Sequence, residues 1–261
     1  MNRIDQNFLK LKLSGKVAFM PFLVAGDPNF KISLEIVRKI LPYADLLELG
    51  FPYSDPLADG PVIQAADARA LSSGMNIDRV FEFIRRIREI SQVPITVLVY
   101  ANLVLQRGLH QFYKAARKSG IDGILIPDLP FEEAKEFIAA AKKYQINQIF
   151  LVTHTTTKQR LNNILKYAQG YIYLVLVLGT TGVRKSFSPD VKVLIRRVKK
   201  STKLPVSVGF GVASKEQIAG LVKFGADGVI MGSRLIKIIE EFREFKDLPQ
   251  RVQKFVKTVL P

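Results

Sequence analysis

The sequence contains no cysteine and only two histidines among its 261 residues. Without cysteine the chain can form neither disulfide bonds nor thiolate metal sites. A metal-dependent enzyme would need histidine and carboxylate ligands that cluster. His110 is instead expected at the start of a helix and His154 after a strand, so the sequence predicts no metal site.

Long hydrophobic runs are also missing. The longest apolar run, Tyr171 to Leu178, has the length of a strand, whereas a helix that spans a bilayer needs roughly 20 residues. The first residues, MNRIDQNFLKLKL, contain no unbroken apolar segment after their charges, so we expect no secretory signal. The expected location is the cytoplasm, with no membrane partner.

Acidic residues are few, because 23 carboxylates face 39 lysines and arginines and leave a net charge of +16. The basic residues are dispersed along expected helices, and no nucleic-acid-binding module accompanies them. We therefore interpret them as a solvated surface and expect no nucleic-acid partner. A positive field would also favour an anionic substrate, although charge alone does not identify one.

Short apolar runs alternate with amphipathic stretches along the chain. The runs that we expect to form strands are Val17–Val24, Leu46–Gly50, Pro94–Tyr100, Gly123–Ile126, Gln148–Val152, Tyr171–Val177, Val206–Val208 and Gly228–Met231. The expected helices are Asp5–Leu13, Phe30–Leu41, Ile77–Ser91, His110–Ser119, Glu132–Tyr144, Lys158–Tyr167, Pro189–Ser201, Lys215–Phe224 and a last one from Ile236 onward. Eight strand–helix units in about 250 residues are typical of a closed barrel.

The sequence therefore predicts an α/β protein with a (β/α)8 TIM-barrel fold. We expect residues 1–261 to form a single domain, with an extra N-terminal helix that covers the barrel. An open, doubly wound sheet is the alternative. That fold would usually carry a glycine-rich fingerprint after its first strand, whereas here the first strand leads into AGDPN at residues 25–29, a turn and helix cap.

Glycine-rich loops follow the last three expected strands. They contain Gly179 and Gly182, then Gly209-Phe210-Gly211, then Gly232-Ser233. Active sites of such barrels lie at the C-terminal ends of the strands, and the loops after strands 7 and 8 often bind phosphate. Each loop alone could be only a tight turn, but three neighbouring loops favour a phosphate site.

Three carboxylates lie at or after the second strand. Glu48 would be desolvated if it points into the barrel mouth, which raises its pKa and suits it to pass a proton; the alternative is a structural ion pair. Asp59 lies on a loop rich in proline and glycine, and its alternative role is to cap the helix that begins near Pro61. Asp55 belongs to SDP, which is ordinary turn chemistry.

Other mechanisms fit the strand ends less well. No expected strand ends in the lysine that a Schiff-base aldolase would need, and no G-x-S-x-G elbow of a hydrolase is present. Metal-free acid–base chemistry on a phosphorylated substrate, without a cofactor, remains.

Several segments resemble the tryptophan synthase alpha chain family, in the order expected for that family. They are MPFLVAGDP, LLELGFPYSDPLADGPVIQ, LVYANLV, ILIPDLP, TTGVR, VGFGV and IMGSRLIK. The resemblance covers nearly the whole chain, and the segment around Glu48 is its most specific part. It implies a carbon–oxygen/carbon–carbon lyase of tryptophan biosynthesis that cleaves indole-3-glycerol phosphate to indole and glyceraldehyde 3-phosphate.

The resemblance also implies roles for individual residues. Glu48 and Asp59 would be the catalytic pair, with Tyr173 supporting them. The residues that match the substrate pocket are Phe22, Ile63, Leu98, Leu125 and Phe210 around the indole ring, and Gly182, Gly211, Gly232 and Ser233 at the phosphate. Thr181 matches a residue that hydrogen-bonds Asp59 when the loop after the sixth strand closes.

Members of this family work with a beta chain in an αββα heterotetramer. The beta chain binds pyridoxal phosphate and receives indole through a tunnel, so the resemblance implies no cofactor in this chain. The residues that match the docking surface are Asp55, Pro56, Tyr100 and Asn102.

Three residues depart from the family's pattern near the sixth strand. Leu176 and Val177 stand where a serine is common, and Thr180 replaces a usual valine. These changes bear on loop closure and on coupling to the beta chain. Two alternatives to an active lyase subunit therefore remain: a catalytically weakened alpha chain that mainly docks on and activates the beta chain, and a stand-alone lyase.

Overall fold

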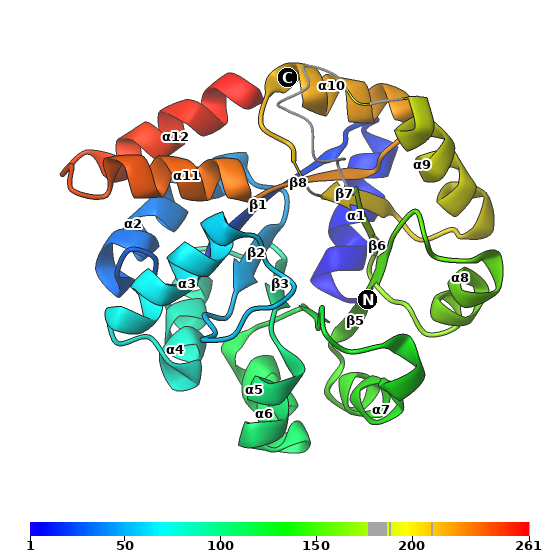
Figure 1. The fold of residues 1–261 in the computed structure, drawn as a ribbon, viewed down its shortest axis with the longest axis horizontal. Helices are drawn as coiled ribbons and strands as arrows, with labels where there is room; N and C mark the ends of the chain where they lie inside the picture. The colour runs from blue at the N-terminus through cyan, green and yellow to red at the C-terminus, as the bar shows by residue number, and fades with distance from the viewer. Residues whose placement is uncertain (177–186, 188, 210, 261) are drawn as a thin grey trace.

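Eight parallel strands close into a barrel in the order of the chain (Figure 1). The computed structural model describes residues 1–176, 187, 189–209 and 211–260. The strands are β1 (Ala18–Val24), β2 (Leu47–Gly50), β3 (Ile95–Leu98), β4 (Gly123–Leu125), β5 (Asn147–Val152), β6 (Ile172–Val175), β7 (Val206–Gly209) and β8 (Gly228–Met231). The predicted (β/α)8 fold is confirmed, and the open-sheet alternative is wrong because β8 pairs with β1.

Helices surround the barrel (Figure 1). They are α1 (Arg3–Leu13), α2 (Phe30–Ile40), α3 (Pro61–Ser72), α4 (Ile77–Arg88), α5 (Ala101–Arg107), α6 (Leu109–Ser119), α7 (Lys135–Tyr144), α8 (Lys158–Leu165), α9 (Pro189–Ser201), α10 (Lys215–Phe224), α11 (Ser233–Phe242) and α12 (Leu248–Val259). Single 3-10 turns, Leu41–Tyr43 and Phe131–Glu133, precede β2 and α7. Among the described helices, none is long and apolar enough to cross a bilayer.

The last expected helix is in fact two helices, α11 and α12. Pro249 occupies the first turn of α12, where its missing N–H is harmless, but a helix running through it would lose a hydrogen bond and clash with the preceding turn. The single-helix prediction from Ile236 onward is therefore wrong.

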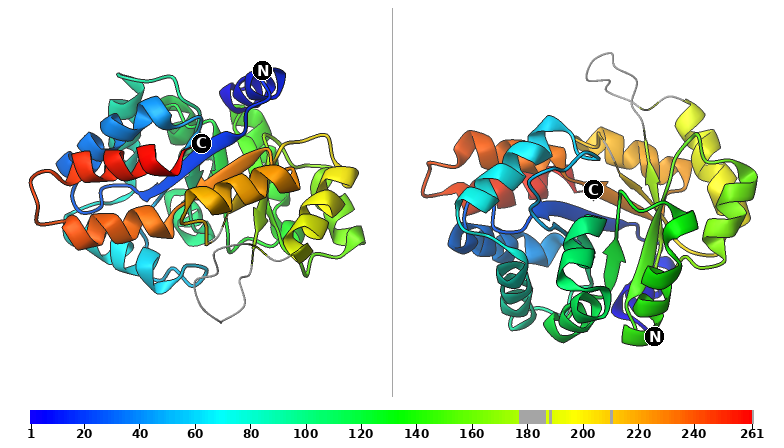
Figure 2. Two further views of the ribbon diagram at one scale, coloured as in Figure 1. Left: turned by 90° about the horizontal axis from the view of Figure 1, so that it is seen from above. Right: turned by 60° about the horizontal axis from the view of Figure 1, so that its bottom comes forward.

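Helix α1 covers the end of the barrel at which the strands begin, as expected (Figure 2). It starts with a capping box in which the Asn2 side chain accepts from the backbone of α1 and Asp5 accepts from the Asn2 N–H. Its apolar face is buried, and the Phe8 ring lies 5.8 Å from the ring of Tyr171. The N-terminal helix thus closes the floor of the barrel, and the opposite end is left for a site.

Candidate active site

Glu48 points into the barrel interior from β2. Phe22, Glu48 and Thr96 are neighbours across β1, β2 and β3, so their side chains share one face of the sheet. That face is the inner one, because a Cβ on Gly50 of β2 or on Gly232, which follows β8, would crowd the Phe22 ring. Glu48 therefore places a carboxyl in the interior of the barrel.

The Glu48 carboxyl is fully buried, and neither of its oxygens has a hydrogen-bond partner within the described residues. Within the described residues Glu48 therefore forms no structural ion pair. Burial, together with the nearby charge of Asp59, raises the pKa of Glu48 to about 8. The expected rise is confirmed, and the carboxyl can hold a proton near neutral pH and release it in a reaction.

Asp59 lies beside this carboxyl on the loop between β2 and α3. The Tyr100 hydroxyl donates to Asp59 Oδ2 over 2.7 Å and accepts from the Ala58 N–H over 3.1 Å. Burial raises the pKa of Asp59, and the bond from Tyr100 opposes that rise. The helix-cap alternative is wrong, because Gly60 is the N-cap of α3 and no side chain caps it.

Tyr53 is a site residue that the sequence did not indicate. Its ring stacks on Tyr100 with centroids 5.0 Å apart, and its hydroxyl accepts from Asn102 Nδ2 over 3.0 Å. Asn102, Tyr53, Tyr100 and Asp59 thus form a continuous series of contacts from the surface to the site. The sequence offered one sign of its role, which is that an aromatic residue stands between the two prolines of FPYSDP.

Tyr173 points inward from β6 toward the two acids. A Cβ on Gly209 would lie 2.5 Å from its hydroxyl oxygen, so glycine is needed beside it. Burial and the charges of Glu48, Tyr171 and Asp59 raise the pKa of Tyr173 well above 10. The phenol therefore stays neutral and can only donate or accept hydrogen bonds.

Apolar side chains line the barrel mouth beside the acids. Gly50, Leu98 and Leu125 form one row across β2, β3 and β4. Leu125 is buried and Leu98 is half-buried, as is Ile63 on α3. Phe22 lies 5% exposed against Gly232. The described residues of the expected indole pocket are therefore near the acids.

The expected phosphate residues are described in part. Gly232 is the N-cap of α11 and Ser233 its first residue, where backbone N–H groups are free to bind an anion. Gly211 has a φ of 73°, which favours glycine. Thr181, Gly182 and Phe210 lie outside the described residues, as do Val177, Gly179 and Thr180.

The expected docking residues differ in exposure. Asp55 and Asn102 are exposed, whereas Pro56 and Tyr100 are buried. Leu57, which the sequence did not single out, is 84% exposed on the same loop, between Pro56 and Asp59. A docking surface here would rest on Asp55, Leu57 and Asn102.

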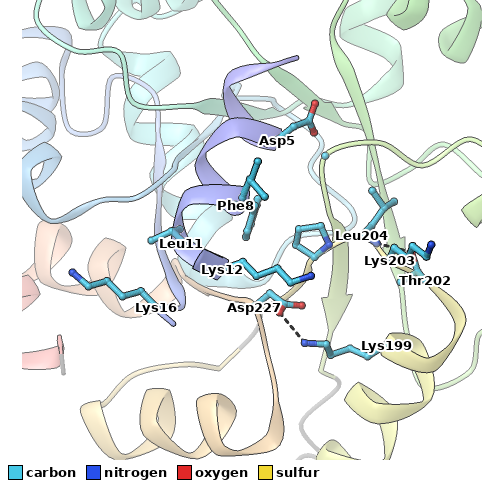
Figure 3. Close-up of a pocket in the computed structure, with 13 residues that line it drawn as sticks. Asp5, Phe8, Leu11, Lys12, Lys16, Lys199, Thr202, Lys203, Leu204 and Asp227 are labelled. Atoms are coloured by element: carbon cyan, nitrogen blue, oxygen red, sulfur yellow. Dashed lines mark hydrogen bonds and ion pairs between the residues drawn. The ribbon is translucent and has the colours of Figure 1, made fainter. Parts of the chain in front are cut away.

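The cavity drawn in Figure 3 lies at the other end of the barrel, beside α1. It has a volume of about 660 Å³, and Phe8, Leu11, Leu204 and Pro205 are among its lining residues. Lys199 pairs with Asp227 at its edge over 2.7 Å. It contains none of the expected site residues. No group of three potential metal ligands occurs in the described part of the chain.

Comparisons with known proteins give one consistent result. Residues 8–259 match the family model for the tryptophan synthase alpha chain. The alpha chain of Methanoregula boonei is 46% identical over 92% of this chain and 90% of its own length, and that of Methanothermobacter thermautotrophicus is 49% identical over 85% and 83%. The alpha subunit structure from Legionella pneumophila superposes with a TM-score of 0.91 at 36% identity, covering 99% of this chain and 97% of that one. A tryptophan synthase complex from Pyrococcus furiosus gives 0.86 at 36% identity, covering 93% and 97%.

Proposed function

Because this chain belongs to the tryptophan synthase alpha chain family, we propose that Glu48 and Asp59 are the catalytic pair of its lyase reaction. The reaction cleaves indole-3-glycerol phosphate to indole and glyceraldehyde 3-phosphate, a step of tryptophan biosynthesis. The observation that carries the proposal is the buried, unpaired Glu48 carboxyl beside Asp59.

Glu48 has the properties of a proton carrier. With a pKa raised to about 8, it is largely protonated at pH 7 and can deliver its proton to indole C3. The resulting carboxylate then takes the proton of the hydroxyl on the adjoining glycerol carbon. The hydroxyl oxygen then forms the C=O bond of glyceraldehyde 3-phosphate as the carbon–carbon bond breaks. The electron pair of that carbon–carbon bond returns to the protonated ring, which leaves as indole.

Asp59 complements this transfer at the ring nitrogen. Its carboxylate would accept a hydrogen bond from the indole N–H and stabilise the positive charge that appears on the ring when C3 is protonated. The hydroxyl of Tyr100 holds Asp59 Oδ2, and Thr181 would add a second bond on loop closure. Tyr173, kept neutral by its surroundings, supports the pair.

The remaining site residues would hold the substrate. We assign Phe22, Ile63, Leu98, Leu125 and Phe210 to the indole ring, and Gly182, Gly211, Gly232 and Ser233 to the phosphate. The free N–H groups at the start of α11 support the phosphate assignment. A positively charged protein would also attract this dianionic substrate.

A beta chain is the partner of this subunit. Structural relatives include the tryptophan synthase α2β2 complex of Pyrococcus furiosus. We propose an αββα heterotetramer in which Asp55, Pro56, Tyr100 and Asn102 belong to the docking region and the beta chain carries pyridoxal phosphate. We also propose that residues 1–261 act as one domain in the cytoplasm, where this biosynthetic step would meet its substrate.

Glu48→Gln and Asp59→Asn test the catalytic pair. Each should lower kcat for indole-3-glycerol phosphate cleavage by at least about 100-fold, since positioned acid–base groups contribute that much or more. Indole release is measured with and without a beta chain, and circular dichroism checks the fold. Glu136→Gln, which changes an exposed acid on α7, is the matched control. Full activity of Glu48→Gln would refute the role of Glu48.

A further inference from the structure

Two buried hydroxyls near Glu48 have no role in the reaction described above. Thr96 and Tyr171 are each 0% exposed, as is Glu48, and their side-chain oxygens have no hydrogen-bond partner within the described residues. An unpaired buried hydroxyl is costly, so native proteins satisfy such groups with protein atoms or with ordered water. The two hydroxyls and the Glu48 carboxyl are all unpartnered in the barrel interior, within the described residues, which points to a shared hydrogen-bond partner.

These groups lie together beneath the substrate pocket. Glu48 and Thr96 are direct neighbours across β2 and β3. Tyr171 immediately precedes β6, and its phenol senses both the Glu48 charge and the Thr96 hydroxyl, although burial is the largest cause of its raised pKa. The Thr96 hydroxyl is close enough to the phenol to lower its pKa, but the two hydroxyls do not meet hydrogen-bond geometry.

The surroundings separate this space from bulk solvent below. Gly123 is the neighbour of Thr96 on β4 and brings no side chain to that flank. The Ile4 side chain of α1 lies 2.8 Å from the Cβ position of Gly123, and the Phe8 ring packs against Tyr171. Helix α1 therefore covers Glu48, Thr96 and Tyr171 from below.

We propose that Thr96 and Tyr171 hold an internal water molecule beneath Glu48, and that this water positions the Glu48 carboxyl and stabilises its charged form. The proposal rests on the proposed role of Glu48 in catalysis. Thr96 and Tyr171 are then positioning residues, because they act on the substrate only through Glu48.

The hydrogen bonds of this arrangement balance. The neutral Tyr171 hydroxyl donates to the water, and the water donates to the Glu48 carboxylate. The Thr96 hydroxyl either donates to the water or accepts from it. The water then has three polar partners, within the two to four that a buried water needs. The titratable groups that face Glu48 are Asp59 on its loop and Tyr171 and Tyr173 from β6. Phe22 and Thr96, from the two neighbouring strands, do not titrate. Negative charge on Asp59 disfavours the Glu48 carboxylate, and the water would supply a favourable contact for it from below.

Thr96→Val and Thr96→Ser provide the central test. Valine keeps the shape but cannot hold the water, so the Glu48 pKa should rise by about one further unit, the size expected for loss of one hydrogen bond to a charged group. Serine keeps the hydroxyl and should leave it near the wild-type value. The pKa is read directly by NMR titration of protein labelled with ¹³C at the glutamate carboxyls, with Glu48→Gln to assign the signal. The alkaline limb of the kcat profile should move upward in Thr96→Val by the same amount.

Two further variants keep the test decisive. Tyr171→Phe should raise the Glu48 pKa in the same direction, which covers the case in which Thr96→Val does not fold. Ser207→Ala removes another buried, unpartnered hydroxyl, but Ser207 neighbours Tyr173 rather than Glu48, so the Glu48 pKa should not change. An unchanged Glu48 pKa in folded Thr96→Val and Tyr171→Phe would overturn the proposal, as would a crystal structure without water between these groups. Because the NMR titration needs no turnover, a protein that shows the shifts but cleaves no substrate would refute the proposed function alone.

Discussion

Asp67 is a buried carboxyl on α3 that is not part of the proposed catalytic pair. It is 3% exposed, and burial, reinforced by the charges of Asp59 and Asp27, raises its pKa from 3.8 to about 8. Between these two values the folded protein keeps a proton that the unfolded chain releases. The contribution of Asp67 to the free energy of unfolding is therefore complete below about pH 4 and is lost as the pH rises through about 8.

Asp67→Asn should remove this pH dependence, since asparagine resembles the protonated acid and cannot ionise. At pH 8 the variant should be more stable than the wild type by roughly 5 kcal/mol, at about 1.4 kcal/mol per unit for the rise from 3.8 to about 8, and near pH 4 the difference should vanish. Urea unfolding at both pH values measures it. Glu136→Gln should show no such pH-dependent gain, and a gain of equal size at pH 4 would contradict the explanation.

Single residues also show what the sequence could and could not predict. Strand alternation placed Glu48 and Gly50 on one face without saying which face is inner, and a raised pKa was expected if Glu48 pointed inward; the structure shows the inward direction and the raised pKa. The contact between Tyr100 and Asp59 joins positions 41 residues apart, so no local pattern contains it. The catalytic roles themselves stay predictions until the substitutions are made.

At the scale of elements, the hydrophobic periodicity predicted all eight strands, and three-dimensional context decided their ends. The third strand was expected over Pro94–Tyr100 but spans Ile95–Leu98, because Tyr100 turns away as the N-cap of α5. Helix α5 itself was not predicted, since its seven residues are too few to show a helical period. Short elements at the barrel mouth are therefore the least visible in the sequence.

Helix α1 is held on the barrel by a buried charge network. Asp122 is 1% exposed and pairs with Arg3 of α1 over 2.9 Å and with Arg88 of α4 over 2.6 Å. It also accepts from the Ile95 N–H at the start of β3. One carboxylate thus connects two helices and a strand at the floor of the barrel.

Asp122→Ala should destabilise the fold by about 3–5 kcal/mol, the usual cost of breaking a buried ion pair by removing one partner. The loss leaves Arg88, whose side chain is 11% exposed, without its carboxylate. Urea unfolding followed by circular dichroism gives the free energy of unfolding. Glu35→Gln breaks the exposed pair with Arg38 and should cost less than about 1 kcal/mol. Equal effects of the two substitutions would rule out this role of Asp122.

At the scale of the whole molecule, strand count and spacing were enough to predict barrel closure, because eight strand–helix units have one common solution. The loop-closure prediction falls on Thr181, outside the described residues, whereas Gly211, Gly232 and Ser233 of the phosphate prediction are described. The glycine-rich loops themselves indicated the phosphate site, whereas loop closure followed from family resemblance alone. Both predictions remain to be tested by binding and kinetics.

The exposed loop from Asp55 to Asp59 is the surface on which we base a prediction for assembly with the beta chain. Leu57 is 84% exposed on a backbone fixed by bonds from the Leu57 N–H to Asp55 O and from the Asp59 N–H to Pro56 O. A rigid, exposed leucine next to the expected docking residues Asp55 and Asn102 has the character of an interface anchor. The same loop carries Asp59, so docking there would reach the proposed catalytic pair directly.

Leu57→Asp should therefore weaken binding to a beta chain by at least about tenfold, because it places an unpaired charge in an apolar contact. The cleavage rate of the isolated alpha chain should stay within about twofold of wild type. Stimulation of that rate should require a beta-chain concentration that is higher by the same factor as the loss in affinity. Calorimetric titration gives the affinity and indole release gives both rates. Leu13→Asp is the matched control, since Leu13 is 81% exposed on α1 at the opposite end of the barrel. Equal weakening by both substitutions would mean that net charge, rather than the Asp55–Leu57 loop, governs the complex.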